Sequence, residues 1–222
     1  KFLTDFTTVG KYLGALDKTR FDGFLRAVST SSKDINVITL NYTNTLEKIL
    51  GLNAGVTTKA FSSSTYLRNI IHVHGQLGES IIIGVDHPAQ MKNETFRNNE
   101  DIKDIMIKIE SNESMKETRH MECERLIAYA NVIVLFGVSL GETDARWWKL
   151  IGQNLKRRRN LAIIQHLYNP GAINPTQRQK IRQLERKQQE YLLQRMEVKM
   201  EIGDVDIRDR LFFTVNEPVF QV

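Results

Sequence analysis

The sequence is poor in cysteine, since Cys123 is the only one in 222 residues. A single cysteine excludes an intrachain disulfide, and no cysteine–histidine cluster has the spacing of a zinc site. A chain of this length can bury enough surface to fold without either kind of cross-link. Low cysteine content suits a reducing compartment, and we expect a cytoplasmic protein.

Long apolar runs are also missing. A membrane-spanning helix needs about 20 consecutive apolar residues, and no run in this sequence approaches that length. There is no secretory signal pattern either. We therefore expect no membrane span and no membrane partner. The composition, 41% apolar and 26% charged, is ordinary for a soluble globular protein.

Both standard nucleotide-binding fingerprints are absent. Neither GxGxxG nor GxxxxGK[ST] occurs in the chain, so the usual dinucleotide loop and the Walker phosphate loop are excluded. No pattern of paired carboxylates with a lysine can be placed, which leaves a nuclease without support. We find no internal repeat and no low-complexity tract. Candidate chemistry must therefore be sought where predicted strands end.

The most informative stretch is residues 35–46, INVITLNYTNTL. Its apolar start is typical of a strand buried in a parallel sheet. The strand ends at four consecutive polar residues, 41–44, and Thr43 or Asn44 can cap a helix over residues 46–50. Open α/β folds place their ligands where a strand ends in this way. We therefore take Asn41 as the first candidate site residue.

Alternating strand and helix patterns predict an α/β fold of Rossmann-like type, with a mainly parallel, doubly wound sheet. We expect one domain over residues 1–222, with a helical insertion about 87–129 and a charged accessory helix about 175–199. Within the insertion, residues 87–99 are predicted as a loop or lid. Further strands are predicted over residues 56–61, 69–73, 80–85, 131–136, 161–164 and 211–215, and further helices over 2–13, 21–28, 102–109, 116–129 and 147–155.

Three polar loops follow three of the predicted apolar strands. They are residues 41–44, 74–75 and 137–144. If the strands are parallel, all three loops lie at one edge of the sheet and face one ligand.

The pair His72 and His74 would share one face of a strand. Two histidines at this spacing could bind a metal with Asp86 or His87, but a third ligand is not evident, and we predict no metal site. For His72 we prefer a packed, hydrogen-bonded role. His74 differs because Gly75 lets a ligand approach the backbone, and a neutral imidazole at a strand end can act as a general base.

Two other candidates keep alternative interpretations. Asn41 could cap a helix, or its amide could hold a water or a sugar hydroxyl. Gly137 and Ser139 precede a helix and suit an anionic or ribose group. Thr143 or Asp144 would cap that helix.

Together, three blocks of sequence resemble a known family. They are TLNYTNTLE at 39–47, VHG at 73–75 and FGVSLGETD at 136–144. These blocks look like the AbiH family of bacterial phage abortive-infection proteins, which in turn looks like a distant branch of the sirtuin-like NAD-binding fold. The resemblance spans Thr39 to about Trp148.

The resemblance implies a role in phage defence and hydrolysis of NAD+ to nicotinamide and ADP-ribose, with NAD+ as substrate and no metal. Carried over by motif, Asn41 and His74 are the catalytic pair. The implied cofactor-binding residues are Thr39, Gly75, Gly137, Ser139 and Asp144. The strand and glycine-rich loop that normally open the family's fold have no match before Ile35, so we expect this chain to lack them. The absent zinc cysteines argue against a protein deacylase.

The competing interpretation is a non-catalytic nucleotide-binding module. The net charge is +5, and the excess gathers at residues 156–159 and 178–199. This basic C-terminal region could engage nucleic acid or a partner protein, or it could be a solvated helical face. On either interpretation, a second copy of the chain or a partner protein from a defence system is among the expected partners.

Overall fold

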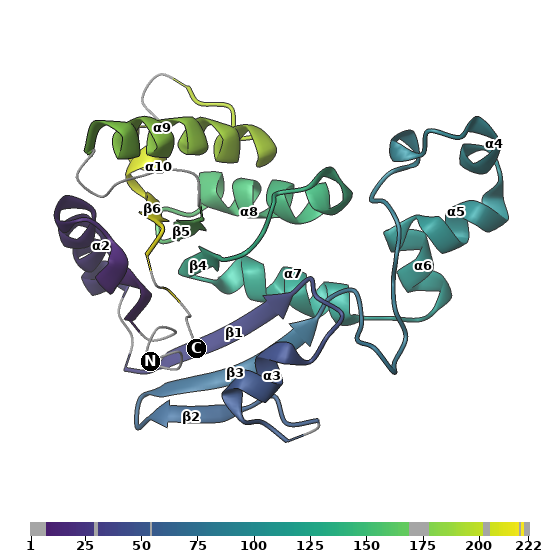
Figure 1. The fold of residues 1–222 in the computed structure, drawn as a ribbon, viewed down its shortest axis with the longest axis horizontal. Helices are drawn as coiled ribbons and strands as arrows, with labels where there is room; N and C mark the ends of the chain where they lie inside the picture. The colour runs from purple at the N-terminus through teal and green to yellow at the C-terminus, as the bar shows by residue number, and fades with distance from the viewer. Residues whose placement is uncertain are drawn as a thin grey trace. The chain divides into compact units, whose positions relative to one another are not determined.

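The computed structural model describes residues 8–28, 31–53, 55–168, 178–201, 205–217 and 219. The chain divides into two compact units, and the ribbon in Figure 1 labels their helices and strands. The β1 unit consists of Ser31–Leu126 and Gly141–Arg146. The β4 unit consists of Lys1–Thr30, Ile127–Leu140 and Trp147–Val222. Each unit is described by itself below.

The β1 unit is built on a three-stranded sheet. Its strands are β1 (Lys33–Thr39), β2 (Lys59–Ser62) and β3 (Thr65–His72), in the order β1-β3-β2. β1 runs parallel to β3 and β2 runs antiparallel to it. Thr39 is the register partner of His72. The loops after β1 and β3 therefore lie at the same edge of the sheet, as the sequence predicted.

A short helix follows the first of these loops. α3 (Thr45–Leu50) ends at Gly51, whose φ of 63° suits a helix C-cap. Asn44 occupies the N-cap position, but its side chain makes no capping hydrogen bond. The predicted helix is confirmed, and its capping by the side chain of Asn44 is not.

Helices dominate the rest of the β1 unit. They are η2 (Pro88–Gln90), α4 (Glu94–Arg97), α5 (Glu100–Met106), α6 (Lys108–Ser114), most of α7 (Arg119–Tyr129), and η3 (Glu142–Asp144). α4 and α5 begin at Asn93 and Asn99, whose side chains accept hydrogen bonds from backbone N–H groups of the first turn. Figure 1 shows α4, α5 and α6 grouped together in teal.

The single helix predicted over residues 102–109 is interrupted. Ile107 is extended, with φ −94° and ψ 116°, and it forms a parallel bridge with Val85. This bridge divides the segment into α5 and α6. The strand predicted over residues 80–85 is also wrong, because that stretch forms only isolated bridges, to Gly75 and to Ile107.

The β4 unit carries a second sheet, which is wholly parallel. Its order is β4 (Val132–Leu135), β5 (Ala162–Leu167), β6 (Leu211–Val215). The helices of this unit are η1 (Val9–Tyr12), α2 (Ala15–Val28), most of α8 (Ala145–Arg157), α9 (Arg178–Arg195) and α10 (Val205–Asp209).

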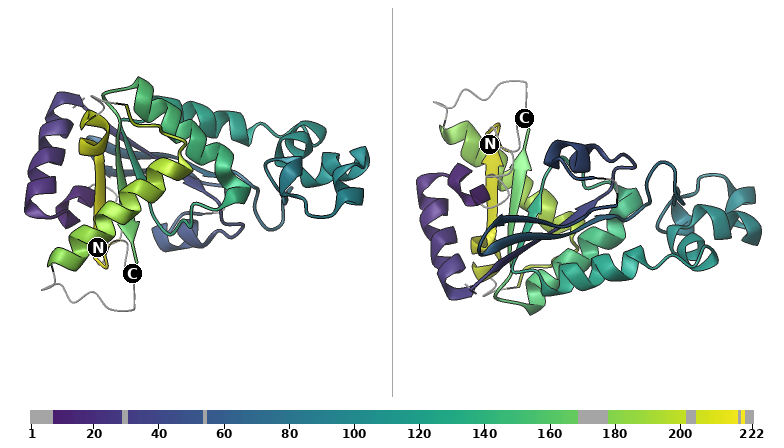
Figure 2. Two further views of the ribbon diagram at one scale, coloured as in Figure 1. Left: turned by 90° about the horizontal axis from the view of Figure 1, so that it is seen from above. Right: turned by 90° about the horizontal axis from the view of Figure 1, so that it is seen from below.

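Apolar packing holds α2 and α8 in the β4 unit. The Phe21 ring of α2 meets the Phe212 ring of β6 edge-on, with 5.2 Å between ring centroids. Both views of Figure 2 show the purple helix α2 running beside the yellow strand β6. α8 buries Trp147 and Trp148, so these tryptophans are packed residues and not an exposed stacking surface.

These observations confirm the mixed α/β class and the parallel pairing of core strands. The described strands form two three-stranded sheets and not the single, mainly parallel, doubly wound sheet that we expected. Sequence pattern marks a strand but not its neighbours, and β2 pairs antiparallel with β3. The accessory helix predicted at 175–199 corresponds to α9, with residues 175–177 outside the described part of the chain. Of the helix predicted over 2–13, residues 2–7 also lie outside it.

Candidate active site

The candidate site begins at the edge where β1 and β3 end. Thr39 Oγ1 accepts a hydrogen bond of 3.1 Å from the backbone N–H of Asn41, which shapes the turn after β1. The backbone N–H of Leu77 donates to the carbonyl of Tyr42 at 2.8 Å. The loops after β1 and β3 are therefore bonded to each other as well as lying at one edge.

His72 is a structural histidine. Its buried ring contacts the carbonyl oxygen of Asn41 through Nδ1 at 2.8 Å and Glu47 Oε1 through Nε2 at 2.7 Å. Both ring nitrogens of His72 are therefore engaged by oxygen atoms of the protein. The predicted packed, hydrogen-bonded role is confirmed. Neither nitrogen is left for a metal.

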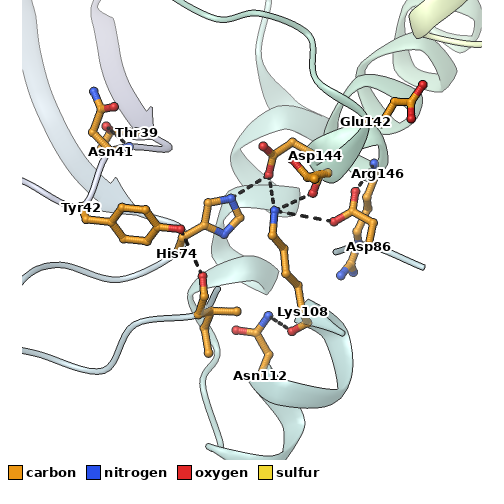
Figure 3. A network of polar contacts seen from close by, with 12 residues as sticks. Thr39, Asn41, Tyr42, His74, Asp86, Lys108, Asn112, Glu142, Asp144 and Arg146 are labelled. Atoms are coloured by element: carbon orange, nitrogen blue, oxygen red, sulfur yellow. Dashed lines mark hydrogen bonds and ion pairs between the residues drawn. The ribbon is translucent and has the colours of Figure 1, made fainter. Parts of the chain in front are cut away.

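His74 is held by a carboxylate. Its ring is buried, and Nε2 lies 2.8 Å from Asp144 Oδ1. Nδ1 has no hydrogen-bond partner among the described residues. The Tyr42 ring lies beside it, with 6.4 Å between ring centroids. Figure 3 shows this arrangement, with His74 between Tyr42 and Asp144. Since Nε2–H donates to Asp144 in the neutral ring, Nδ1 carries the lone pair that a general base needs.

Asp144 is the centre of a charged cluster. Its Oδ1 also accepts from Lys108 Nζ at 2.6 Å, and the same amine donates to the Thr143 carbonyl at 2.5 Å. Burial raises the pKa of Asp144, but the hydrogen bonds and charges of His74 and Lys108 outweigh this and lower it to about 2. The carboxylate is therefore ionised at any physiological pH. The sequence predicted a helix cap here; Asp144 does directly precede Ala145 of α8, yet its Oδ1 serves His74 and Lys108.

Asp86 contacts Lys108 on the side opposite Asp144. Its Oδ1 lies 4.0 Å from Lys108 Nζ, and its Oδ2 accepts from the backbone N–H of Arg146 at 2.9 Å. Burial raises the pKa of Asp86, while the Arg146 hydrogen bond and the Lys108 charge act in the opposite direction. Gln90 connects the two acidic segments, because it accepts from the Asp86 N–H and donates to the Glu142 carbonyl.

Tyr42 completes the surroundings of His74. Its hydroxyl points to the Ile82 carbonyl at 3.5 Å. Burial, assisted by the negative charge of Asp144, raises the pKa of Tyr42. The phenol therefore stays protonated and can donate a hydrogen bond.

Asn41 stands apart from this cluster. Its side chain is exposed and makes no hydrogen bond to a described residue. Figure 3 shows the amide directed away from His74, with Tyr42 between them. The structure therefore brings His74 and Asp144 together, and it leaves Asn41 at the same sheet edge with a free amide.

Backbone conformation and close packing require a glycine at position 75. Its φ is +86°, and a Cβ there would lie 1.9 Å from the carbonyl oxygen of Ser80. The space that we expected a ligand to use beside this glycine is occupied by backbone. The need for glycine is thus explained by packing, which corrects the reason given from sequence.

Gly137 and Ser139 line an open pocket in the β4 unit. The third predicted loop follows β4, which belongs to the second sheet, so the single shared edge that we predicted for three loops holds for two of them. The pocket has a volume of about 640 Å³ and is formed where β4, β5 and β6 end. Gly137 has a φ of +65°, and a Cβ there would meet open space. Ligand sites are expected at such carboxyl ends of parallel strands.

Aromatic rings form one wall of this pocket. The Phe136 ring stacks on His166 with 5.3 Å between centroids. Burial lowers the pKa of His166, so this ring is neutral at physiological pH. Arg195 donates to the carbonyl of Leu140 at 2.7 Å, which fixes the end of the 137–140 loop.

Sequence reasoning missed Lys108 entirely and weighed Asp86 only as a metal ligand. One signal was available for Lys108, which interrupts the apolar run Met106, Ile107, Ile109. A lysine inside such a run is either at the edge of an apolar stripe or buried with a partner. Here it is buried, 8% exposed.

Two searches of the described residues gave no result. No group of three or more His, Cys, Asp or Glu side chains there could hold a metal ion. None of the helices in this part of the chain combines the length and the apolar character needed to cross a membrane. Cys123 is buried, and burial followed by the charges of Glu122 and Glu124 raises the pKa of its thiol to about 12.

Comparison with known proteins gives one match. The family model described as bacteriophage abortive infection AbiH matches residues 9–166. This span contains the three blocks singled out from the sequence and extends beyond them on both sides. Searches of curated proteins and of solved structures give no match.

Proposed function

The chain belongs to the bacteriophage abortive infection family AbiH, and we propose that it serves this defence by hydrolysing NAD+ to nicotinamide and ADP-ribose. The observation that carries the proposal is the contact between His74 Nε2 and Asp144 Oδ1 at 2.8 Å. A histidine oriented by a carboxylate, with its second nitrogen free, is the usual arrangement of a general base.

The main chemical task of the protein in this reaction is to accept a proton from water, and His74 is the group that does so. The bond between C1′ of the ribose and the nicotinamide nitrogen breaks, and its electron pair leaves with neutral nicotinamide. A water oxygen then bonds to the oxocarbenium-like C1′ and gives its proton to Nδ1 of His74. Asp144 stabilises the imidazolium that forms. Positioning and proton acceptance are the contributions asked of the protein.

Asn41 is assigned to the water or to a ribose hydroxyl. Its exposed amide offers one donor group and one acceptor group, and neither is used by a described residue. Thr39 and Gly75 support the site indirectly, since Thr39 shapes the turn at Asn41 and Gly75 allows the turn after His74. Gly137 and Ser139 line the pocket of the β4 unit and are kept as candidate nucleotide-binding residues of that unit by itself.

The test is the release of nicotinamide by the full-length protein incubated with NAD+. The first variant is His74→Ala, and the matched control is His87→Ala, an exposed histidine of the same unit whose ring accepts only from the Ala89 N–H. We expect His74→Ala to lose ~10²–10⁴ in rate per folded molecule and His87→Ala to retain it. Equal rates in the two variants would contradict the proposal.

One observation favours the alternative, a nucleotide-binding module that engages nucleic acid or a partner protein. α9 exposes four cations over two turns, Lys180, Arg182, Arg186 and Lys187. Phosphate contacts by such cations give an affinity that falls steeply with salt. NAD+ that binds but remains intact, together with salt-sensitive binding of DNA or RNA, would favour the module over the enzyme.

A further inference from the structure

Lys108 is a buried cation whose place in the chain is fixed from both sides. Its backbone N–H donates to the Val85 carbonyl at 2.9 Å. Its own carbonyl accepts from Asn112 Nδ2 at 2.6 Å. The bridge between Val85 and Ile107 fixes the backbone of Ile107, the residue that precedes Lys108. The backbone therefore delivers this side chain to one spot, and Figure 3 shows the extended chain reaching from α6 to Asp144.

The amine of Lys108 meets the same oxygen as His74. Nζ lies 2.6 Å from Asp144 Oδ1, and Nε2 of His74 lies 2.8 Å from that atom. Burying a charge is costly, and buried ion pairs are on average no more stabilising than apolar packing. An ion pair built onto the one carboxylate that orients a general base is therefore better explained by its effect on that base.

We propose that Lys108 is a positioning residue that offsets the charge of Asp144 and so keeps His74 neutral, as proton acceptance requires. The groups that face His74 are Tyr42 from the loop after β1, Asp86, Asp144 of η3, and Lys108 of α6. Tyr42 is a neutral phenol. The net charge around the His74 ring is therefore set by the carboxylates of Asp86 and Asp144 and by the ammonium group of Lys108.

Removing the ammonium group changes this net charge in one direction. His74 would then face Asp144 directly and Asp86 nearby, with no buried cation among them. Nearby negative charges favour the imidazolium form. A ring already protonated on Nδ1 cannot take a proton from water. The role assigned to Lys108 rests on the proposed function only where it concerns rate, since the protonation of His74 can be observed without any substrate.

The first experiment follows the protonation of His74 by NMR in the full chain, with the signal assigned from a His74→Gln variant. In Lys108→Met, the pH midpoint of this protonation should rise, because the carboxylate of Asp144 then acts on the ring without the ammonium group beside it. Lys108→Arg, which keeps the charge, should restore it. The matched control is Lys103→Met, because Lys103 lies in the neighbouring helix α5 and pairs only with Glu100. It should leave His74 unchanged.

The second experiment measures the pH dependence of nicotinamide release. In Lys108→Met the acid limb of the kcat profile should move to higher pH, in the same direction as the protonation of His74. The plateau at high pH and the KM should stay within a few-fold of the parent protein. A purely structural lysine would instead lower the plateau without moving the limb.

The outcomes separate this role from the proposed function. An unchanged His74 midpoint in Lys108→Met overturns the role, whatever happens to the rate. If Lys108→Met does not fold, Lys108→Gln is used, and the same rise is expected because this variant also lacks the charge. A midpoint that rises in a protein unable to release nicotinamide supports the role of Lys108 and contradicts the NAD+ hydrolase.

Discussion

His74 and Asn41 differ in how their replacement should appear. His74 is buried on Asp144, whereas the amide of Asn41 is exposed and unbonded. We expect Asn41→Ala and His74→Ala each to abolish nicotinamide release. Asn41→Ala should leave the melting temperature unchanged, and His74→Ala should lower it by breaking a buried contact. The double variant should be little slower than either single one, since residues that act as a unit are not additive.

These variants are compared per folded molecule, with the folded fraction taken from near-UV circular dichroism. Asn41→Asp is a useful control because it keeps the shape of the side chain and removes the amide donor. Additive losses in the double variant would show that the two residues serve separate steps.

His72 should behave in the opposite way to His74. His72→Ala removes the two ring contacts to Asn41 and Glu47, and it leaves Oε1 of Glu47 without a partner, as Oε2 already is. Leaving a buried hydrogen-bonding group without its partner costs about 1–3 kcal/mol, and we expect about 3 kcal/mol for the two contacts together. The measurement is urea unfolding. Activity per folded molecule should be retained; its complete loss would mean that His72 is the essential histidine.

At the scale of the elements, we compare the loss of stability when alanine replaces Gly75 or Gly78, two glycines in the turns after β3. Both have φ in the left-handed region, +86° and +94°. A Cβ on Gly75 would meet the Ser80 carbonyl at 1.9 Å, whereas a Cβ on Gly78 would meet open space. Gly78→Ala should cost about 1 kcal/mol from backbone strain alone. Gly75→Ala should cost clearly more, because it adds the clash.

Thermal unfolding of the two glycine variants, with equal protein concentrations, measures this difference. Equal destabilisation would show that Ser80 gives way easily and that strain is the whole effect.

The charged run at residues 156–159, for which a solvated helical face was one of two interpretations, is not uniformly exposed. Arg158 donates to the carbonyl of Ala128 and to Asn160, whereas Arg159 is 94% exposed. Only Arg159 and its exposed neighbours suit a salt-sensitive binding surface.

At the scale of the molecule, local pattern predicted the elements better than their assembly. The apolar run at 35–40 with its polar end correctly indicated β1 and the turn at Asn41, but the expected burial is wrong, because β1 lies at the edge of its sheet and none of its residues is fully buried. The packed, hydrogen-bonded role predicted for His72 is confirmed, but the ring of His74, two residues beyond the end of β3, is buried and hydrogen-bonded as well. The confirmed parts of both predictions concern neighbours in sequence, where periodicity acts directly.

The partners of His74 could not be read in this way. Asp144 lies 70 residues further on, and Lys108 lies in a helical segment that sequence marked only by its apolar spacing. The pairing of strands into two sheets depends on which edges meet, and no local signal carries that information. Asp144 was identified as a candidate by resemblance, but its helix-start position suggested a cap and concealed its ion pairs.

The ionisation of Asp144 predicts how the whole molecule responds to acid. Its pKa is lowered to about 2, against 3.8 in an unfolded chain. A carboxylate with a lowered folded pKa stabilises the fold above the unfolded pKa and loses this effect as pH falls toward the folded pKa. The full contribution, about 2 kcal/mol, is thus present at pH 5 and falls by about 1 kcal/mol on going to pH 3.

The variant that tests this is Asp144→Asn, followed by urea unfolding at pH 5, 4 and 3. The difference in unfolding free energy between parent and variant should shrink over this range, because Asn has no proton to gain. The contribution of Asp86 to stability changes with pH in the opposite direction. Burial raises its pKa, so the native state takes up its proton more readily than the unfolded chain. Asp86→Asn should therefore not reproduce the trend. Asp34→Asn is the surface control, because Asp34 pairs with Arg68 and both side chains are 50% exposed. Its effect on the unfolding free energy should be small, as is usual for an exposed ion pair. A constant difference between the parent and Asp144→Asn would show that Asp144 is held by packing, and that its two charged donors contribute little to the folded state.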